Sequence, residues 1–143
     1  MTPRTSVYRH QVRYHEMDAQ GIVFNGRYWE FFDVAMGEFF GDRGWTFDAM
    51  AQEGFVPSLV HVEADFNGPA TVDDRLEIAV HCLRVGRSSF QLGFEVHRSD
   101  GVLLTTASIV YVNFDSATHA SRPIPSVLRE QLAQAVGDGS PAG

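Results

Sequence analysis

The segment from Tyr14 to Tyr28 is the part of the sequence whose residue types could do chemistry. It reads YHEMDAQGIVFNGRY, with Asp18 in a polar turn followed by the apolar step Ile22–Phe24, which drives the backbone inward. If the turn folds back, the Asp18 carboxylate approaches the free amide groups at the start of a following helix. Such amides form an oxyanion hole for a carbonyl, and a nearby carboxylate serves as base or nucleophile. The alternative is that Asp18 only caps the turn or the helix, as many aspartates do.

A long helix is expected directly after this segment. From Asn25 onward, apolar residues recur at steps of three and four, which predicts one buried aromatic stripe along about four helical turns. Asn25 is a candidate N-cap, and Gly41 and Gly44 end the helix. The stripe comprises Tyr28, Phe31, Phe32, Ala35, Met36, Phe39 and Phe40.

The rest of the chain predicts a sheet around this helix. Short helices are expected over Phe47–Gln52 and after Pro123 and Pro125, the latter with Val127, Leu128, Leu132 and Val136 as apolar positions. A helix with so wide an apolar stripe needs a sheet to wrap it, so the fold class is α+β, with a curved, largely antiparallel sheet around one central helix. We expect one domain over residues 1–137 and a disordered tail over 138–143. Alternating residues place the strands at Val7–Tyr14, Leu59–Phe66, Arg75–Val85, Ser89–His97 and Val102–Asn113.

Composition narrows the function classes. The chain has 143 residues, with 11 basic residues, all arginine, against 18 acidic ones and a formal charge of −7. This balance argues against a broad nucleic-acid surface, and without lysine no Schiff base can form. Cys82 is the single cysteine, so no intrachain disulfide can form, and this fits a reducing cytoplasm. Its apolar neighbours in the strand indicate that Cys82 is a small buried side chain and not a nucleophile. No apolar run is long enough to span a membrane, and the six histidines lack helical metal-ligand spacing, so neither membrane nor metal is expected.

The candidate segment resembles the signature of the 4-hydroxybenzoyl-CoA thioesterase family of hotdog-fold acyl-CoA thioesterases. The shared pattern is Asp18-x-x-Gly21-Ile22-Val23-x-x-x-x-Tyr28, preceded by Tyr14 and followed by Asp33. The order of elements agrees over about residues 6 to 130. The turn VGRSSF at 85–90 and the stretch RPIP at 122–125 are similar to two further segments of the family.

The resemblance implies a hotdog subunit that pairs into a dimer with a continuous sheet, often further into a tetramer, with active sites at the dimer interface. Asp18 would be the catalytic carboxylate, which either attacks the carbonyl or activates water. The backbone amide at Asn25 or its neighbours would polarise that carbonyl. Some members place a histidine where this chain has Asn25, and Asn25 could hydrogen-bond substrate or cap the helix.

The same resemblance supplies candidate substrate contacts. Gly21 is expected to contact the substrate, and Phe24, Tyr28 and Trp29 are candidates to line an acyl pocket, where an aromatic acyl group would stack well. The alternative for the residues of the helix stripe is ordinary core packing. Coenzyme A carries a pyrophosphate and a 3′-phosphate, so an acidic protein needs a local cationic site for it. Arg84 and Arg87, with Ser88, flank the turn between two strands and are the candidates, and Arg122 is a weaker one. The alternative is that they are solvated turn residues.

The expected function is therefore that of a cytoplasmic acyl-CoA thioesterase, a homodimer or homotetramer, acting on an aromatic or short-chain acyl group. No cofactor is implied, because coenzyme A is part of the substrate. Two alternatives stay open: a thioesterase for acyl carrier protein thioesters, and a non-catalytic module that binds acyl-CoA.

Overall fold

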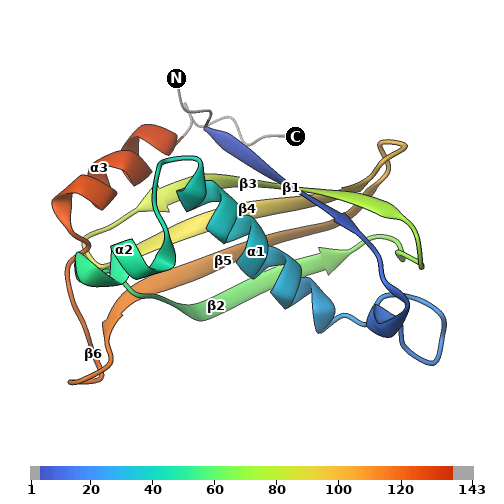
Figure 1. The fold of residues 1–143 in the computed structure, drawn as a ribbon, viewed down its shortest axis with the longest axis horizontal. Helices are drawn as coiled ribbons and strands as arrows, with labels where there is room; N and C mark the ends of the chain where they lie inside the picture. Colours follow the sequence, from blue (N-terminus) through green and yellow to red (C-terminus); the bar gives the residue numbers. More distant parts are fainter. Residues whose placement is uncertain (1–3, 137–143) are drawn as a thin grey trace.

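The computed structural model describes residues 4–136, in which an antiparallel sheet wraps one long helix (Figure 1). The sheet order is β1, β3, β4, β5, β2, and every neighbouring pair is antiparallel. Helix α1 crosses one face of this sheet, and α2 and α3 lie toward one end of it. The elements are β1 (Thr5–Gln11), the 3₁₀ turn η1 (Tyr14–Glu16), α1 (Arg27–Gly41), α2 (Phe47–Gln52), β2 (Pro57–Phe66), β3 (Arg75–Val85), β4 (Ser89–Arg98), β5 (Leu103–Asp115), β6 (Ala120–Ser121) and α3 (Ser126–Ala135).

The aromatic stripe of α1 forms the centre of the core, as predicted. Every residue assigned to the stripe is buried. The Phe32 ring lies 4.8 Å from the Phe94 ring of β4, and Phe40 meets Phe55 and Phe90 edge to face. Such pairs add about 0.5–1.5 kcal/mol each beyond the area they bury. Gly44, predicted to end the helix, adopts a left-handed backbone with φ of 89°, which favours glycine.

Most strand boundaries lie within two residues of the predicted ones, but the first strand lies earlier in the chain than predicted, over Thr5–Gln11 instead of Val7–Tyr14. It ends at Gln11 instead of Tyr14, because its partner β3 begins at Arg75, directly opposite Gln11. Beyond that point the Val12 amide donates to the Asp74 carbonyl, and the chain turns into η1. The prediction failed here because the end of a strand depends on where its neighbour starts.

Helix α3 packs against β3. The buried residues of α3 are Leu128, Leu132 and Ala135. Val127 was predicted on this apolar face but is 44% exposed, because it lies in the first turn on the side away from the sheet.

The Cys82 thiol is buried as predicted, and burial raises its pKa to about 11. Cys82 is therefore a protonated, poorly reactive thiol at neutral pH. The predicted tail, 138–143, lies outside the described residues.

The two edge strands of the sheet differ in how they are covered. Helix α1 packs mainly against β1 and β3, and β2 at the other edge receives much less cover. Strand β2 accordingly exposes large apolar side chains, with Leu59 47%, Val60 55% and Phe66 42% exposed. A ten-residue edge strand of this kind presents unpaired backbone groups to solvent. Within residues 4–136, no helix is long and apolar enough to cross a membrane.

Candidate active site at the start of helix α1

The turn that carries Asp18 folds back on itself, as the sequence suggested. Met17 and Val23 form an antiparallel bridge, the Asp18 amide donates to the Ile22 carbonyl at 2.8 Å, and the Gly21 amide returns to the Asp18 carbonyl at 3.0 Å. Gly21 has φ of 78°, a left-handed conformation that explains glycine at this position. The turn therefore has a fixed shape and leads directly into α1.

The Asp18 carboxylate is half-buried and closes its own turn. Its Oδ1 accepts the Gln20 amide at 2.8 Å. Within the described chain it makes no hydrogen bond to the amides at the start of α1. The capping role expected as the alternative is therefore present, and one carboxylate oxygen stays available for a second partner.

The start of α1 differs from the prediction in its cap. Gly26, not Asn25, is the N-cap residue, and no side chain caps the helix. The Asn25 backbone carbonyl accepts the Tyr28 amide at 3.1 Å, but among the described residues no first-turn amide donates to the Asn25 side chain. Among the described residues, no acceptor is paired with the backbone amides of Asn25 and Gly26. Two unpaired amides at the positive end of a helix dipole suit an oxygen that gains negative charge.

A surface cavity of about 300 Å³ opens beside these amides. Its lining comes from the end of the Asp18 turn, the start of α1 and the end of β2, and comprises Ile22, Val23, Asn25, Tyr28, Phe66, Asn67, Gly68 and Pro69. Tyr28 is almost fully buried, its ring meets Phe66 edge to face at 5.3 Å, and burial raises the pKa of its hydroxyl. The cavity thus combines an aromatic wall with Asn25, whose backbone amide is unpaired, while Gly26 and Asp18 are not part of its lining.

Phe24 does not line this cavity. Its side chain is 56% exposed and lies over Gly26, where an added Cβ would come within 2.6 Å of the ring. Phe24 is therefore not part of the aromatic wall of this cavity, and its contact with an acyl group stays a prediction. The structure gives Gly26 a role that the sequence did not indicate, which is to leave room for this ring.

Arg84, Arg87 and Ser88 lie at the opposite end of the sheet from Asp18. Their turn joins β3 to β4 beside α2 and α3, whereas the Asp18 turn follows the other end of β1 (Figure 1). Arg84 contacts the Ser89 hydroxyl at 3.4 Å and is exposed. Arg122 is close to this same end, since the amide of Ile124, two residues further along the chain, donates to the Arg87 carbonyl. One chain therefore does not bring these phosphate candidates to Asp18.

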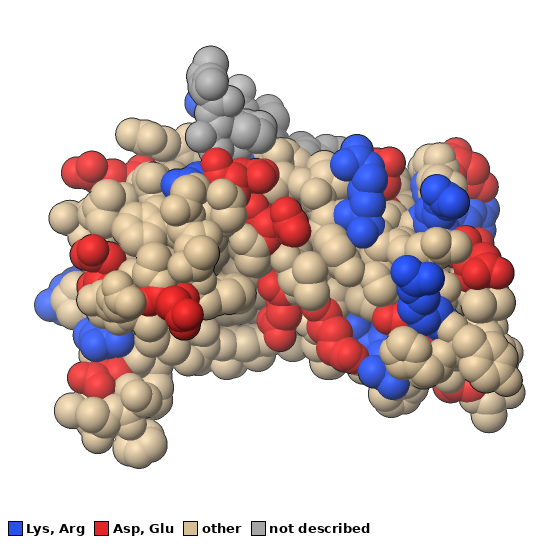
Figure 2. Space-filling model, viewed as in Figure 1, with Lys and Arg blue, Asp and Glu red and all other residues tan. Residues whose placement is uncertain are grey.

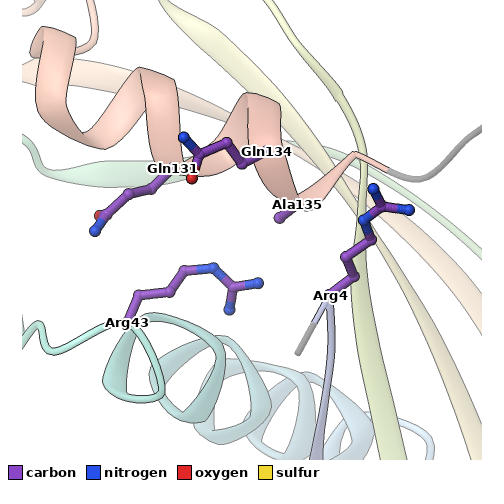
Figure 3. A pocket seen from close by; sticks show the side chains of 5 residues that line it. All are labelled: Arg4, Arg43, Gln131, Gln134 and Ala135. Atoms are coloured by element: carbon purple, nitrogen blue, oxygen red, sulfur yellow. The ribbon is translucent and has the colours of Figure 1, made fainter. Parts of the chain in front are cut away.

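Other arginines gather nearer to the Asp18 turn. Figure 2 shows several of them at the right-hand end, where β1 ends in Figure 1. Arg9, Arg13 and Arg75 border a groove of about 480 Å³ there, and Arg9 already contacts Glu77 at 3.8 Å. A smaller cavity of about 90 Å³ lies between α1, α3 and the start of β1, lined by Arg4, Arg43, Gln131, Gln134 and Ala135 (Figure 3).

Within residues 4–136, no group of three or more His, Cys, Asp or Glu side chains is arranged to hold a metal ion.

Sequence reasoning missed a buried carboxylate two residues before Asp18. Glu16 is only 7% exposed, and its carboxylate contacts the His10 ring and the Arg13 amide. Spacing gives no signal for this pair, because His10 lies in a strand and Glu16 in a turn. Asp33, noted as part of the motif, is on α1, where burial raises the pKa of its carboxyl.

A family model described as the thioesterase-like superfamily matches residues 12–132, which include the Asp18 turn, α1 and the whole sheet except β1. The chain belongs to the thioesterase-like superfamily.

Relatives and solved structures extend over nearly the whole chain. The 1,4-dihydroxy-2-naphthoyl-CoA hydrolase of Synechococcus elongatus is 25% identical over 136 residues, covering 87% of this chain and 93% of that protein. The acyl-CoA thioester hydrolase YbgC of Escherichia coli O6:H1 is 24% identical over 132 residues, covering 91% of this chain and 98% of that protein. The crystal structure of the 1,4-dihydroxy-2-naphthoyl-CoA thioesterase Slr0204 from Synechocystis matches with a TM-score of 0.81 at 21% identity, covering 90% and 96% of the two chains.

These comparisons confirm three expectations drawn from the sequence. The thioesterase family resemblance is confirmed, and the fold is the hotdog fold. This member of the thioesterase-like superfamily is also a thioester hydrolase, the enzyme class expected from the Asp18 motif.

Proposed function

We propose that this thioesterase hydrolyses an acyl-CoA to the free acid and coenzyme A at the start of α1. The observation that carries the proposal is the unpaired backbone amide of Asn25, a residue that lines the cavity next to the Asp18 turn. The thioester carbonyl oxygen accepts a hydrogen bond from the Asn25 amide. The dipole of α1 adds to this polarisation, which strengthens as negative charge develops on the oxygen.

Asp18 supplies the reacting carboxylate by one of two routes. As a general base, it takes a proton from water, whose oxygen bonds to the carbonyl carbon while the carbon–sulfur bond breaks. As a nucleophile, its oxygen forms a mixed anhydride and releases the thiolate, and water then hydrolyses the anhydride. In both routes the sulfur leaves as a thiolate and is protonated to free coenzyme A. No cofactor takes part, because coenzyme A enters as part of the substrate.

The acyl group that we expect is aromatic. The aromatic wall of Tyr28 and Phe66 offers the edge-to-face contacts that aryl rings prefer. The names of the Synechococcus and Synechocystis relatives, which specify a naphthoyl-CoA, are consistent with this choice. A short acyl chain is the second candidate for the same space.

A second copy of the chain completes the site in this proposal. The exposed edge of β2 suits antiparallel pairing with the β2 of a partner, which joins two sheets into one. Antiparallel pairing reverses the partner, so that its β3–β4 turn comes to the end of the sheet that carries Asp18. Arg84, Arg87 and Ser88 of that turn are then available to the phosphates of coenzyme A. A tetramer and a cytoplasmic location stay predictions.

A thiol-release assay tests the activity. Purified wild-type protein is given benzoyl-CoA, 4-hydroxybenzoyl-CoA, a ladder of aliphatic acyl-CoAs and the matching acyl-pantetheines, with EDTA present in a parallel series. We expect hydrolysis with the highest kcat/KM for an aromatic acyl-CoA, no effect of EDTA, and a higher KM for acyl-pantetheine, which lacks the nucleotide phosphates. No hydrolysis of any CoA thioester would contradict the proposal. Faster hydrolysis of acyl carrier protein thioesters than of acyl-CoA would favour the alternative hypothesis, in which the enzyme acts on the carrier protein.

The oligomeric state is a separate prediction. We expect light scattering to give at least twice the chain mass of 15.9 kDa. Ala64→Pro should lower that mass, because proline removes a backbone donor and disturbs the β2 edge. Ala64 pairs with Ala107 in the register of β2 and β5, so circular dichroism must show that the variant stays folded. A wild-type monomer at assay concentration would contradict pairing through β2.

A further inference from the structure

The carboxylate of Glu16 lies at the base of the Asp18 turn and has no role in the proposed chemistry. His10 Nε2 contacts both of its oxygens, Oε1 at 2.8 Å and Oε2 at 3.0 Å, and the Arg13 amide donates to Oε1 at 2.7 Å. Burial opposes ionisation, but the hydrogen bonds from Arg13 and His10 outweigh it and lower the pKa of Glu16. Glu16 is therefore a buried, ionised carboxylate with defined partners.

His10 is itself held from two further sides. Its Nδ1 lies 2.8 Å from the Tyr8 hydroxyl, so Tyr8, His10 and Glu16 form one hydrogen-bonded chain from β1 to the turn. The imidazole also packs against Phe31 of α1, with ring centroids 4.4 Å apart. The position of the Glu16 carboxylate is thereby tied to the sheet and to the core face of the helix.

Glu16 also holds both arms of the Asp18 turn. Its backbone carbonyl accepts the Phe24 amide at 3.0 Å, next to the Met17–Val23 bridge. Phe24 directly precedes Asn25, whose amide is unpaired, and Met17 directly precedes Asp18. A third tie comes from Arg27 in the first turn of α1, whose Nη2 donates to the His15 carbonyl at 3.3 Å. Movement of Glu16 would thus change the distance between the Asp18 carboxylate and the Asn25 amide.

We propose that Glu16, held by His10 and Tyr8, is a positioning residue that fixes the Asp18 carboxylate relative to the Asn25 amide. This inference rests on the proposed function, and it assigns to the reaction three residues that do not touch the substrate. A buried carboxylate costs stability unless it is fully paired, and an apolar side chain would fill the same space at less cost. The hydrogen-bonded series of Tyr8, His10 and Glu16 would hold two reacting groups at a fixed separation. This explains why a buried carboxylate is kept, because small displacements of reacting groups lower rates strongly.

The main test is Glu16→Gln, which keeps the size of the side chain and an oxygen for the Arg13 amide but removes the charge facing His10. We expect kcat to fall about tenfold while KM changes by less than about threefold. In an Asp18→Asn background, Glu16→Gln should lower the residual rate by less than about twofold, because it acts through Asp18. A merely structural defect would lower both rates by the same factor.

Hydrogen exchange gives a readout that does not depend on activity. In Glu16→Gln, the Val23 and Phe24 amides, which donate to Ala70 and Glu16 carbonyls, should exchange faster, while amides in the centre of β4 stay protected. The matched control is Glu77→Gln, which removes an exposed carboxylate facing Arg9 one register position from His10. This control should leave kcat and exchange in the turn unchanged.

Two results would overturn the inference. One is wild-type kcat in a folded Glu16→Gln protein, and the other is unchanged exchange of the Val23 and Phe24 amides. If Glu16→Gln does not fold, His10→Asn takes its place, because it removes the same contact from the strand side and predicts the same changes. If the wild-type protein hydrolyses no thioester, the proposed function fails, and the exchange experiment still decides whether Glu16 orders the turn.

Discussion

Replacing Asp18 by asparagine is expected to lower kcat for thioester hydrolysis by about 100-fold or more, with little change in fold. The amide oxygen of asparagine can still accept the Gln20 amide that Oδ1 of Asp18 accepts at 2.8 Å, so the turn keeps its shape. What is lost is the negative charge that takes a proton from water or attacks the carbonyl. The measurement is the rate of free-thiol release under saturating substrate.

Asp115→Asn is the matched control for this experiment. Asp115 also closes its own turn, since its Oδ1 accepts the Ala117 amide at 2.9 Å, but it lies at the end of β5 that leads into β6. The two substitutions therefore remove one charge each from the same local geometry. If Asp18→Asn keeps more than half of the wild-type kcat, Asp18 serves only to cap its turn, and the alternative drawn from the sequence is correct.

The sequence carried enough information for the fold because the main elements have strong periodicity. The α1 stripe is a run of bulky apolar residues at helical spacing, and burial of such a run needs little knowledge of its surroundings. The strict alternation in β3, in which Leu76, Ile78 and Val80 point inward, likewise predicted both ends of this strand correctly. The positions of Asp18 and Gly21 in a folded turn followed from the residue types alone.

The site was predicted less completely because its geometry depends on contacts between distant residues. The cap at Gly26 instead of Asn25 arises from how the turn enters the helix, and both residue types are common caps. The bond between His10 and Glu16 joins two elements with no shared period. Arg87 and Asp18 lie at opposite ends of the sheet within one chain, and no sequence pattern describes how a second copy of the chain would be placed.

Phe32→Ala should lower the free energy of unfolding by about 3–5 kcal/mol, because it leaves a cavity in the centre of the core. The Phe32 side chain is completely buried, and its ring lies within 6.3 Å of the rings of Trp29, Tyr28 and Phe94. Urea denaturation at one fixed protein concentration measures the change, because subunit association would make stability depend on concentration.

Phe47→Ala provides the comparison, because it deletes the same side chain from a position that is 51% exposed. It should cost less than about 1 kcal/mol. Equal losses for the two variants would contradict a core centred on α1.

The Phe32→Ala variant also tests the candidate site, since Tyr28 packs against Phe32 on one side and lines the cavity on the other. A Phe32→Ala protein that is still folded should therefore bind an aromatic acyl group more weakly, because the wall that Tyr28 forms is no longer held in place.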